Sequence, residues 1–457
     1  MLAEDLLAAL WRSQHLPEAA LALCSLPAGP SLFPSSFAVG LAVQAAAGAA
    51  ALAACELGHL RGVARQHVSV DKLHAEAEAS AWFSVNGEAP ALWDAFSGLY
   101  RCADGYVRIH ANFEHHRHGA LALLGLAPAT ATRAEAEAAA LGWPALELER
   151  QGAERGLVIT ALRSFAQWDA SPQGQALKGR PLLQVARLGD AAPLPLPELD
   201  QSQRPLAGVR VLELARILAG PVGGRTLAAS GADVMLVNAP YLPNIAALAE
   251  TSRGKRSAHL DLNSAAGEQA LWQLVDGAQV FLQAYRPGAL AARGFGPEAV
   301  AARRPGIVYV SLSAYGDQGP WAGRRGFDSL LQTAMGFNLA EAEGFADTLP
   351  RALPYQVLDQ ASGMLLAFAV ASTLRRQQLE GGSWHVSLSL AQTAGWLRGL
   401  PRLGSVPAGN GALTPWLDTG PSGFGELCAV RPCAQLARTP LGFSRPSVPP
   451  GSDAPRW

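Results

Sequence analysis

Asp359 is the residue whose type and position best suit catalysis. It stands near the start of an expected helix, in the segment Gln-Val-Leu-Asp-Gln-Ala-Ser-Gly-Met at 356–364. A helix N-terminus stabilises an ionised carboxylate, and an ionised carboxylate can act as a covalent nucleophile. The same position also suits a structural N-cap, which satisfies free backbone N–H groups. From the residues alone, the N-cap role is the more favoured one.

A strand, a turn, a helix and a second strand are expected between residues 205 and 237. The largely apolar run 209–214 leads into the turn-prone Ala219-Gly220-Pro221, and a second β-type run follows at 232–237. This order builds parallel sheets, and a turn ahead of a helix offers backbone N–H groups to a phosphate. Because the GxGxxG spacing of dinucleotide sites is absent, the pattern predicts the sheet unit and only allows for a phosphate site.

The same alternation continues to residue 315. Strands are expected at 209–214, 232–237, 257–261, 279–283 and 307–313, and helices at 222–230, 264–276 and 297–303. Asn263-Ser264 is a good N-cap for the helix at 264–276. The repeated order predicts an α/β fold, with a parallel sheet and covering helices in a Rossmann-like large domain, plus a smaller α+β domain.

An Ala-rich helix is expected at 36–56. Its length approaches that of a membrane span, but Ala and Gly partition weakly into lipid, so we expect a buried helix. A second small-residue-rich helix begins near Asp359. Both are followed by a Gly-containing turn and a His-Val-Ser strand, at 67–69 and 385–387. This indicates an internal duplication, in which Ser36 stands opposite Asp359 and only one nucleophile is present.

A β-hairpin is expected around the turn Ala103-Asp104-Gly105, in a mixed region at 80–200. The histidine stretch HxxxxHHxH follows it at 110–118. This spacing fits no standard zinc pattern, so we expect a polar loop and no metal site. Residues 401–457 are rich in Pro and Gly and are expected to form a mostly irregular tail.

Composition excludes several classes of protein. The chain has 457 residues, 49% of them hydrophobic, and a formal net charge of −1, so nothing indicates a surface for nucleic acid or an anionic membrane. Its length gives room for two or three domains. Five scattered cysteines, and no recognisable signal peptide, indicate a reducing and therefore cytoplasmic location.

Consecutive blocks between Pro205 and Leu400 resemble the family III (CaiB/BaiF-type) CoA-transferases. In order, they read LAGVRVLELARILAGP, GADVMLV, RGKRSAHLDL, YRPGALAARGFG and IVYVSLSAYGDQGP. The resemblance implies that Asp359 attacks an acyl-CoA thioester to give an acyl anhydride and then an enzyme-CoA thioester. It implies acyl-CoA and a carboxylic acid as small-molecule substrates, no permanently bound cofactor, and a homodimer.

Further residues fall on positions that contact coenzyme A in that family. The resemblance assigns this role to Ile217, Leu218 and Ala219 in the turn after the first strand, to the basic turn Arg253, Lys255 and Arg256, and to Arg293 and Tyr315. The basic turn is equally compatible with a solvated loop.

The sequence departs from the family pattern in three places. After GADVMLV the family has Glu and a nearby CoA-binding Arg, whereas Asn238-Ala239-Pro240 stands here and no Arg follows until Arg253. The family's mobile Gly-rich loop has only Gly409-Asn410-Gly411 as a substitute. The region at 80–200 resembles the small domain that normally follows the catalytic half, so the chain looks permuted or fused.

We therefore expect a degenerate CoA-transferase-like segment at 1–200, a Rossmann-like catalytic domain at 201–400 and a tail at 401–457. The favoured function is an acyl-CoA:carboxylate CoA-transferase. The α-methylacyl-CoA racemases resemble the sequence nearly as well, but they carry a His where Phe327 stands, and Phe cannot move a proton. An isomerase with another second base, or a non-catalytic CoA-binding relative, stays open as an alternative.

Overall fold

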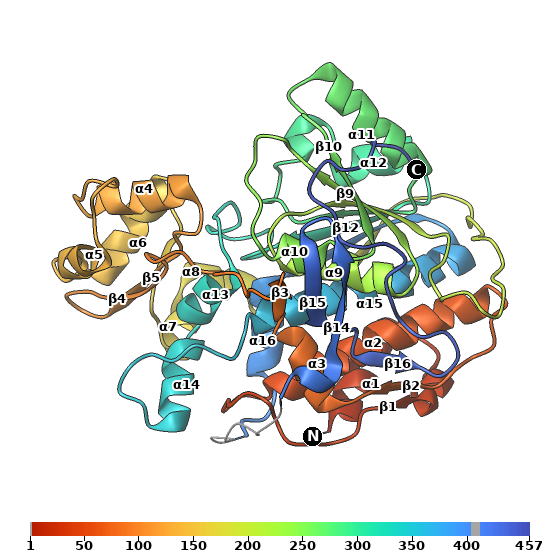
Figure 1. Ribbon diagram of the computed structural model, residues 1–457, viewed down its shortest axis with the longest axis horizontal. Helices are drawn as coiled ribbons and strands as arrows, with labels where there is room; N and C mark the ends of the chain where they lie inside the picture. The colour runs from red at the N-terminus through yellow and green to blue at the C-terminus, as the bar shows by residue number, and fades with distance from the viewer. Residues whose placement is uncertain (1, 404–411) are drawn as a thin grey trace.

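The computed structural model describes residues 2–403 and 412–457. The stretch Gly409-Asn410-Gly411, considered above as a Gly-rich loop, lies outside these residues. The described chain forms a large body around a central sheet, with a smaller lobe beside it, drawn in orange and yellow on the left of Figure 1.

Within the described residues, seven strands form the central sheet in the order β10-β9-β8-β11-β12-β13-β7. Their bounds are β7 (Gln184–Gly189), β8 (Arg210–Leu214), β9 (Asp233–Asn238), β10 (Lys255–His259), β11 (Val280–Gln283), β12 (Val308–Ser313) and β13 (Ser383–Ser389). Neighbours pair in parallel, except that β7 is antiparallel to β13. The five strands predicted between residues 205 and 315 are confirmed to within two residues at each end.

Both faces of this sheet are covered, which explains the nearly unbroken apolar runs of its strands. Successive side chains point to opposite faces: Val211 joins the core shared with α9 and α15, and Leu212 the core shared with α11 and α12. These helices are α9 (Ala219–Ala229), α11 (Ala265–Gly277), α12 (Pro297–Arg303) and α15 (Val357–Glu380). Ser264 caps α11 as predicted.

The start of α9 differs from the prediction. Ala219-Gly220-Pro221, expected as a turn, is the first turn of the helix. Proline is tolerated there because the first N–H groups of a helix have no partner within it. The N-terminus of α9 therefore follows the carboxyl end of β8 after a short turn.

Two long helices, α2 (Val39–Leu60) and α15, pack against each other within the body. Both are long and apolar enough to cross a membrane by length and composition, yet nearly all of their residues are buried inside the protein. The prediction that the Ala-rich segment forms a buried helix is confirmed.

The two His-Val-Ser strands have matching neighbours. In the central sheet, β13 pairs in parallel with β12 and antiparallel with β7. In a second sheet, β2 (Val68–Val70) pairs in parallel with β1 (Cys24–Ser25) and antiparallel with β16 (Ala434–Leu436). Both antiparallel partners come from the opposite half of the chain, and both overlap a Gln-x-Ala-Arg sequence, at 184–187 and 435–438. The two halves therefore interlock through both sheets.

The smaller lobe has its own apolar core. It contains β4 (Gly98–Arg101), β5 (Tyr106–Ile109), β6 (Ile159–Ala161), α4 (Glu114–Leu123), α5 (Arg133–Ala140) and α6 (Ala145–Glu154). The predicted hairpin, β4 and β5, is confirmed. The expected polar loop is wrong for most of the histidine stretch, because α4 begins at Glu114 and carries His115, His116 and His118.

The remaining elements complete the body. They are α1 (Ala3–Ser13), α3 (Lys72–Ala79), α7 (Phe165–Ala170), α8 (Pro172–Leu177), α10 (Leu248–Thr251), α13 (Asp328–Ala334), α14 (Phe337–Phe345), α16 (Leu390–Arg398), β3 (Phe83–Val85), β14 (Leu417–Ser422) and β15 (Gly425–Val430). Strands β14 and β15 form a hairpin, joined by Gly423-Phe424, that pairs with β3. The region expected to be a mostly irregular tail thus contributes β14, β15 and β16.

Candidate active site

Asp359 is the third residue of α15 and is buried, with 7% of its surface exposed. It is not the helix cap that the sequence allowed. Instead, Asp328 caps α15: its Oδ2 accepts hydrogen bonds from the backbone N–H groups of Leu358 (2.7 Å) and Asp359 (3.0 Å). The carboxyl group of Asp359 is therefore free of the capping role.

The two carboxyl groups resist ionisation. Burial raises the pKa of Asp359 well above its ordinary value, and the nearby Asp328 carboxylate raises it further, whereas a backbone hydrogen bond from Ala219 lowers it. Burial also raises the pKa of Asp328, to about 6. The prediction that the helix N-terminus keeps Asp359 ionised is wrong for the free protein, because lost hydration and a second carboxylate outweigh the helix dipole.

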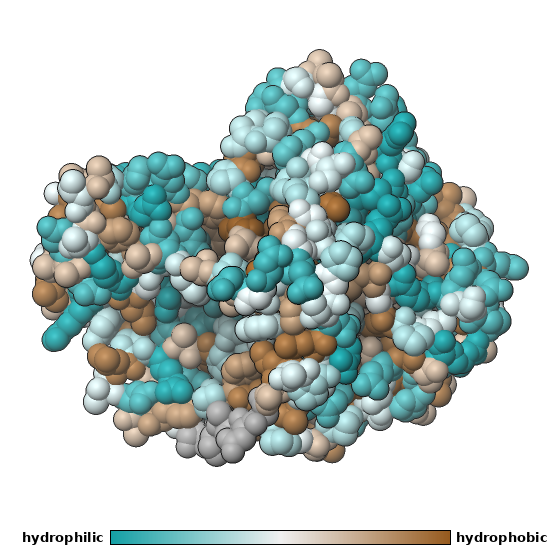
Figure 2. All heavy atoms as spheres, in the orientation of Figure 1, coloured by the Kyte–Doolittle hydropathy of each residue, from teal (hydrophilic) through white to brown (hydrophobic). Residues whose placement is uncertain are grey.

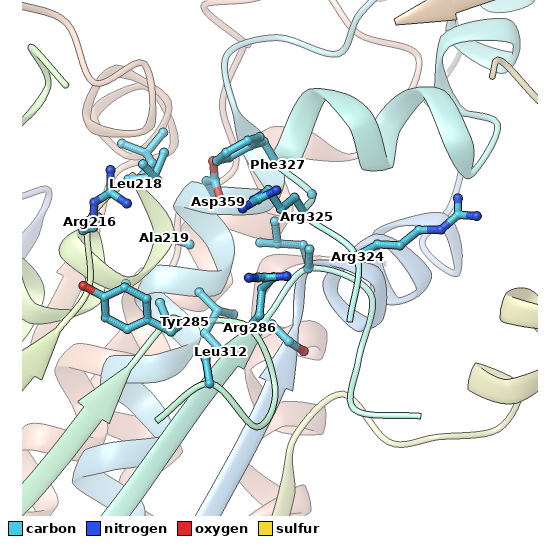
Figure 3. A pocket seen from close by; sticks show the side chains of 18 of the residues that line it. Arg216, Leu218, Ala219, Tyr285, Arg286, Leu312, Arg324, Arg325, Phe327 and Asp359 are labelled. Atoms are coloured by element: carbon cyan, nitrogen blue, oxygen red, sulfur yellow. The ribbon is translucent and has the colours of Figure 1, made fainter. Parts of the chain in front are cut away.

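Asp359 opens onto a cavity of about 310 Å³, which we call the arginine cavity. Figure 2 shows the surface hollowed between the lobe and the body. Four arginines line the cavity: Arg216, Arg286, Arg324 and Arg325. Figure 3 shows the labelled side chains of Arg216, Arg286 and Arg325 around the cavity that Asp359 lines, while the Arg324 side chain extends away from it.

Only one of these arginines has an acidic partner in the described part of the chain. Arg324 lies 3.5 Å from the Glu149 carboxylate. The guanidinium groups of Arg216, Arg286 and Arg325 donate instead to backbone carbonyl groups. Uncompensated guanidinium groups around one cavity suit the binding of an anion such as a phosphate or carboxylate.

The sequence reasoning missed these arginines, although a signal for two of them was present. Arg216 follows β8 by two residues and Arg286 follows β11 by three. Ligands of parallel α/β sheets bind beyond the carboxyl ends of the strands. A basic residue soon after an apolar strand was therefore a better indicator than a basic turn in front of one. Arg325 belongs to the longer loop after β12, which sequence spacing does not place.

The N-terminus of α9 forms another wall of the arginine cavity. Ile217, Leu218 and Ala219, predicted to contact coenzyme A, all line it. The first turn of a helix leaves backbone N–H groups without helical partners, and such groups bind anions. The structure thus brings these three predicted residues together with Asp359.

The predicted cationic residues lie elsewhere, and none of them lines this cavity. Lys255 is buried, and its Nζ contacts the Glu213 carboxylate at 2.7 Å, which ties β10 to β8. Arg253 and Arg256 also form ion pairs with acidic side chains. Arg293 lies on the surface and donates to the loop before α11. The basic turn is therefore a set of structural ion pairs rather than a ligand contact or a solvated loop.

Tyr315, also predicted to contact coenzyme A, does not line the arginine cavity. Its side chain is buried and packs against Trp321, with 5.1 Å between the ring centroids. The ring lies so close to Gly326 that a Cβ there would approach it to 2.6 Å. Tyr315 thus supports the loop that carries Arg325 and Phe327 from behind.

Phe327 stacks on His110 from the lobe, with 4.1 Å between the ring centroids. His115 and His116, on α4, line the arginine cavity. Burial lowers the pKa of His110 to about 4 and that of His116 to about 3. Both rings are therefore uncharged at neutral pH. Across residues 2–403 and 412–457, no group of His, Cys, Asp or Glu is arranged to hold a metal ion.

A second cavity, of about 450 Å³, meets Asp359 from another side, and we call it the neutral cavity. Asp359, Ile217, Leu218 and Phe327 line both cavities. The buried carboxyl group therefore lies at their junction. Residues of the lobe, His110 among them, complete the walls from within the same chain.

Comparisons with known proteins place part of the chain in a family. Residues 206–403 match the family described as CoA-transferase family III. An acyl-CoA transferase of Gibberella moniliformis is 30% identical over 385 residues, which cover 73% of this chain and 66% of the relative. The probable fatty acyl-CoA transferase Rv3272 of Mycobacterium tuberculosis is 34% identical over 207 residues, 42% of this chain and 52% of the relative. A crystal structure of Rv3272 covers 43% of this chain and 58% of its own, with a TM-score of 0.38 and 32% identity.

The matched region contains the ordered blocks found in the sequence and the two carboxyl groups of Asp328 and Asp359. It also contains Arg216 and Arg286, which follow β8 and β11. The chain spans roughly half to two thirds of the length of the two curated relatives named above. Residues 206–403 of the chain therefore belong to CoA-transferase family III.

Proposed function

We propose that this protein is an acyl-CoA:carboxylate CoA-transferase with Asp359 as its covalent nucleophile. One observation carries the proposal: a single buried carboxyl group lies at the junction of an arginine cavity and a neutral cavity. A transferase of this type must hold the CoA portion and the acid on two sides of one reacting atom. The two relatives named above carry acyl-CoA transferase names.

In the first half of the proposed reaction, an Asp359 carboxylate oxygen attacks the carbonyl carbon of acyl-CoA. The C–S bond breaks, CoA leaves as a thiolate, and a mixed anhydride forms. The thiolate then attacks the side-chain carbonyl carbon of Asp359, which releases the first acid as a carboxylate and leaves an aspartyl-CoA thioester.

In the second half, the carboxylate of the acceptor acid attacks this thioester and expels the CoA thiolate, which gives a second mixed anhydride. The thiolate attacks the acceptor's carbonyl carbon, so that the new acyl-CoA forms and the Asp359 carboxylate is regenerated. Each step exchanges one anhydride or thioester for another, and no water enters. Burial of Asp359 supports this route, because the same intermediates hydrolyse where water has access.

The surrounding groups suit these steps. Arg216, Arg286 and Arg325 can bind the phosphate groups of CoA and favour departure of the thiolate. The backbone N–H of Ala219, a residue that lines the arginine cavity together with Asp359, can stabilise the oxyanion that forms when the Asp359 carbonyl is attacked. Only the ionised fraction of Asp359 attacks, so the raised pKa makes the rate rise with pH.

The racemase alternative has weaker support. A two-base mechanism needs a second group that holds or accepts a proton beside Asp359. Phe327 occupies the position of the racemase histidine, and the pKa of the neighbouring His110 is lowered to about 4 by burial. A base that weak accepts protons poorly at neutral pH.

Trapping of the covalent intermediate tests the proposal. The purified full chain is incubated with a pool of acyl-CoAs and quenched with hydroxylamine, and the modified residues are mapped by mass spectrometry. We expect a hydroxamate at Asp359 that depends on acyl-CoA, since hydroxylamine cleaves both an aspartyl anhydride and an aspartyl thioester.

Two variants control this experiment. Asp359→Asn should abolish the modification, and Asp276→Asn, the same change at an exposed ion pair with Arg303, should leave it unchanged. Measurable CoA binding without modification would point to an isomerase or a binding protein. A hydroxamate that forms only at other carboxylates would contradict the role of Asp359.

We also propose a cytoplasmic location and keep the homodimer as a proposal. Light scattering on the purified chain measures its mass directly. The site described here draws its lobe and its body from one chain, so transferase activity by a monomer would be compatible with the mechanism.

A further inference from the structure

The neutral cavity carries information about the acyl group. Its walls are largely apolar, with Ala79, Ala81, Ala91, Ala246, Ala247, Ile217, Leu218, Ile245 and Phe327 among them. Leu92 and Trp93, which also line it, are 45% and 46% exposed. Large apolar residues exposed beside a cavity mark a surface that a ligand covers. The walls therefore suit a carbon chain.

Several buried polar atoms of this cavity have no hydrogen-bond partner in the described part of the chain. They are both carboxamide atoms of Gln360, Oη of Tyr355, Oδ1 of Asn244 and Nδ1 of His110. Gln360 is fully buried. Buried polar groups are nearly always paired, so the unpaired carboxamide of Gln360, a residue that lines the cavity, is available to a ligand or a water molecule.

These unpaired groups are all uncharged. Among the described residues, no Lys or Arg lines the neutral cavity. Its one further acidic side chain, Asp94, is paired with Arg117 at 2.6 Å. A second carboxylate on the acyl group would thus be buried beside Asp359 without a cation, which is strongly unfavourable.

We propose that the neutral cavity binds the acyl group and selects an uncharged chain that carries a hydrogen-bonding substituent, such as a hydroxyl, in preference to a dicarboxylic acyl group. This inference rests on the proposed function, because it takes Asp359 as the reacting group. Gln360 is the main specificity residue, and Tyr355 and Asn244 assist it.

The sequence neighbourhood places the substituent along the chain. Gln360 follows Asp359 directly, and consecutive Cα atoms lie 3.8 Å apart. Both side chains line the same cavity. A group bound by the Gln360 carboxamide must therefore lie within the first few carbons of the acyl group, close to the reacting carbonyl.

Three acyl-CoAs of equal chain length separate the relevant properties: butyryl-CoA, 3-hydroxybutyryl-CoA and succinyl-CoA. The rate of Asp359 acylation, trapped with hydroxylamine, is measured for each with the full chain. We expect 3-hydroxybutyryl-CoA to exceed butyryl-CoA by about 10-fold, as for one neutral hydrogen bond. Succinyl-CoA should fall below butyryl-CoA by a larger factor.

Variants link the preference to residues. Gln360→Leu and Tyr355→Phe should each lower the ratio of the 3-hydroxybutyryl-CoA rate to the butyryl-CoA rate toward one. Gln378→Leu provides a matched control, because it is the same change on the same helix at a residue that lines neither cavity. It should leave all three rates unchanged.

The outcomes distinguish this inference from the proposed function. If succinyl-CoA is the best substrate, or if Gln360→Leu slows all three acyl-CoAs equally, the specificity proposal is wrong, while acylation of Asp359 still stands. The second result would make Gln360 a general donor to the reacting carbonyl oxygen. If none of the three acylates Asp359, and the acyl-CoA pool does not either, the proposed function itself fails.

Discussion

The Asp328 carboxylate caps the helix that carries Asp359. Its Oδ2 accepts hydrogen bonds from the backbone N–H groups of Leu358 and Asp359, and its Oδ1 accepts one from Nε2 of Gln332 at 2.5 Å. One acidic side chain thus fixes the backbone of the proposed nucleophile and also opposes its ionisation, because the two carboxyl groups are buried together. Position and acidity of the site are therefore coupled.

Asp328→Asn separates these two effects. The Asn carbonyl oxygen can still accept the capping hydrogen bonds, but the neighbouring charge is gone, so the pKa of Asp359 should fall. In wild type, kcat/KM should rise with pH along an acid limb well above about 4, the ordinary range for Asp. In the variant this limb should move to lower pH.

Asp328→Ala is the matched comparison. It removes the cap as well as the charge and should lower the free energy of unfolding by about 1–3 kcal/mol, since buried N–H groups lose their partner. A pH profile that is identical in wild type and Asp328→Asn would show that Asp328 has no electrostatic influence on the nucleophile.

Asp359→Asn should stabilise the protein at neutral pH. A carboxyl group whose pKa is raised on folding binds its proton more tightly in the folded state. The protonated carboxyl group contributes stability that is lost as pH rises from its pKa in the unfolded state, about 4, through its higher pKa in the folded state. The variant avoids this loss, so its free energy of unfolding at pH 7, measured by urea unfolding, should exceed that of the wild type.

The gain should largely disappear as pH falls to about 4, where the folded Asp359 carboxyl group is protonated and the unfolded one is half protonated. An equal shift at pH 4 and pH 7 would have another origin, such as improved packing of the amide. A lower stability at pH 7 would contradict the buried, reluctantly ionised carboxylate.

The alternation of strands and helices from residue 205 to residue 315 could be read from the sequence, because both faces of the sheet are covered and local apolar runs report that directly. The exchange of β7 and β16 between the halves could not. It depends on pairings between residues far apart in the chain, such as Gln184 with Ser387 and Gln435 with Ser69. Short strands at such separations leave no periodic signal.

The site divides in the same way. Asp359 and the turn at 217–219 were found through the ordered family blocks. Lys255 was misassigned because the sequence alone does not distinguish a charged surface turn from residues that form buried ion pairs. The role of Asp328 could not be foreseen, since a cap is normally supplied by the residue just before the helix, whereas this one comes from about 30 residues upstream.

Arg286→Gln and Arg325→Gln should weaken binding of CoA. A hydrogen bond to a charged group contributes about 1.5–3 kcal/mol, so each change should raise KM for acyl-CoA by roughly 10- to 100-fold. Dephospho-CoA thioesters lack the 3′-phosphate. With these substrates, the increase in KM should become smaller for a variant of the arginine that contacts the 3′-phosphate, and should stay the same for the other variant. Arg293→Gln, at a surface arginine outside the cavity, is the control and should leave KM unchanged. Loss of binding in the control alone would reverse the assignment.

Proton exchange tests the isomerase alternative independently of any transferase assay. A 2-methylacyl-CoA is incubated with the enzyme in D2O and analysed by mass spectrometry. We expect no deuterium at carbon two, because Phe327 cannot hold a proton and His110 is a weak base when buried. The variants Phe327→Glu and Phe327→His place a base at this position and serve as positive controls, in which exchange becomes possible. Rapid exchange by the wild type would favour the isomerase.

Lys255→Met should affect stability and leave substrate binding unchanged, although the family resemblance assigned this residue to coenzyme A. Its Nζ lies 2.7 Å from the Glu213 carboxylate and 2.8 Å from the Pro221 carbonyl oxygen, and both charged side chains are fully buried. Removal of one partner leaves an unpaired buried charge, which costs about 3–5 kcal/mol. We therefore expect a lower thermal midpoint with an unchanged KM for acyl-CoA in the protein that stays folded.

The double variant Lys255→Met, Glu213→Leu should recover much of the stability, because it removes both charges and fills the space with apolar atoms. A large increase in KM without a change in stability would restore Lys255 to the binding site.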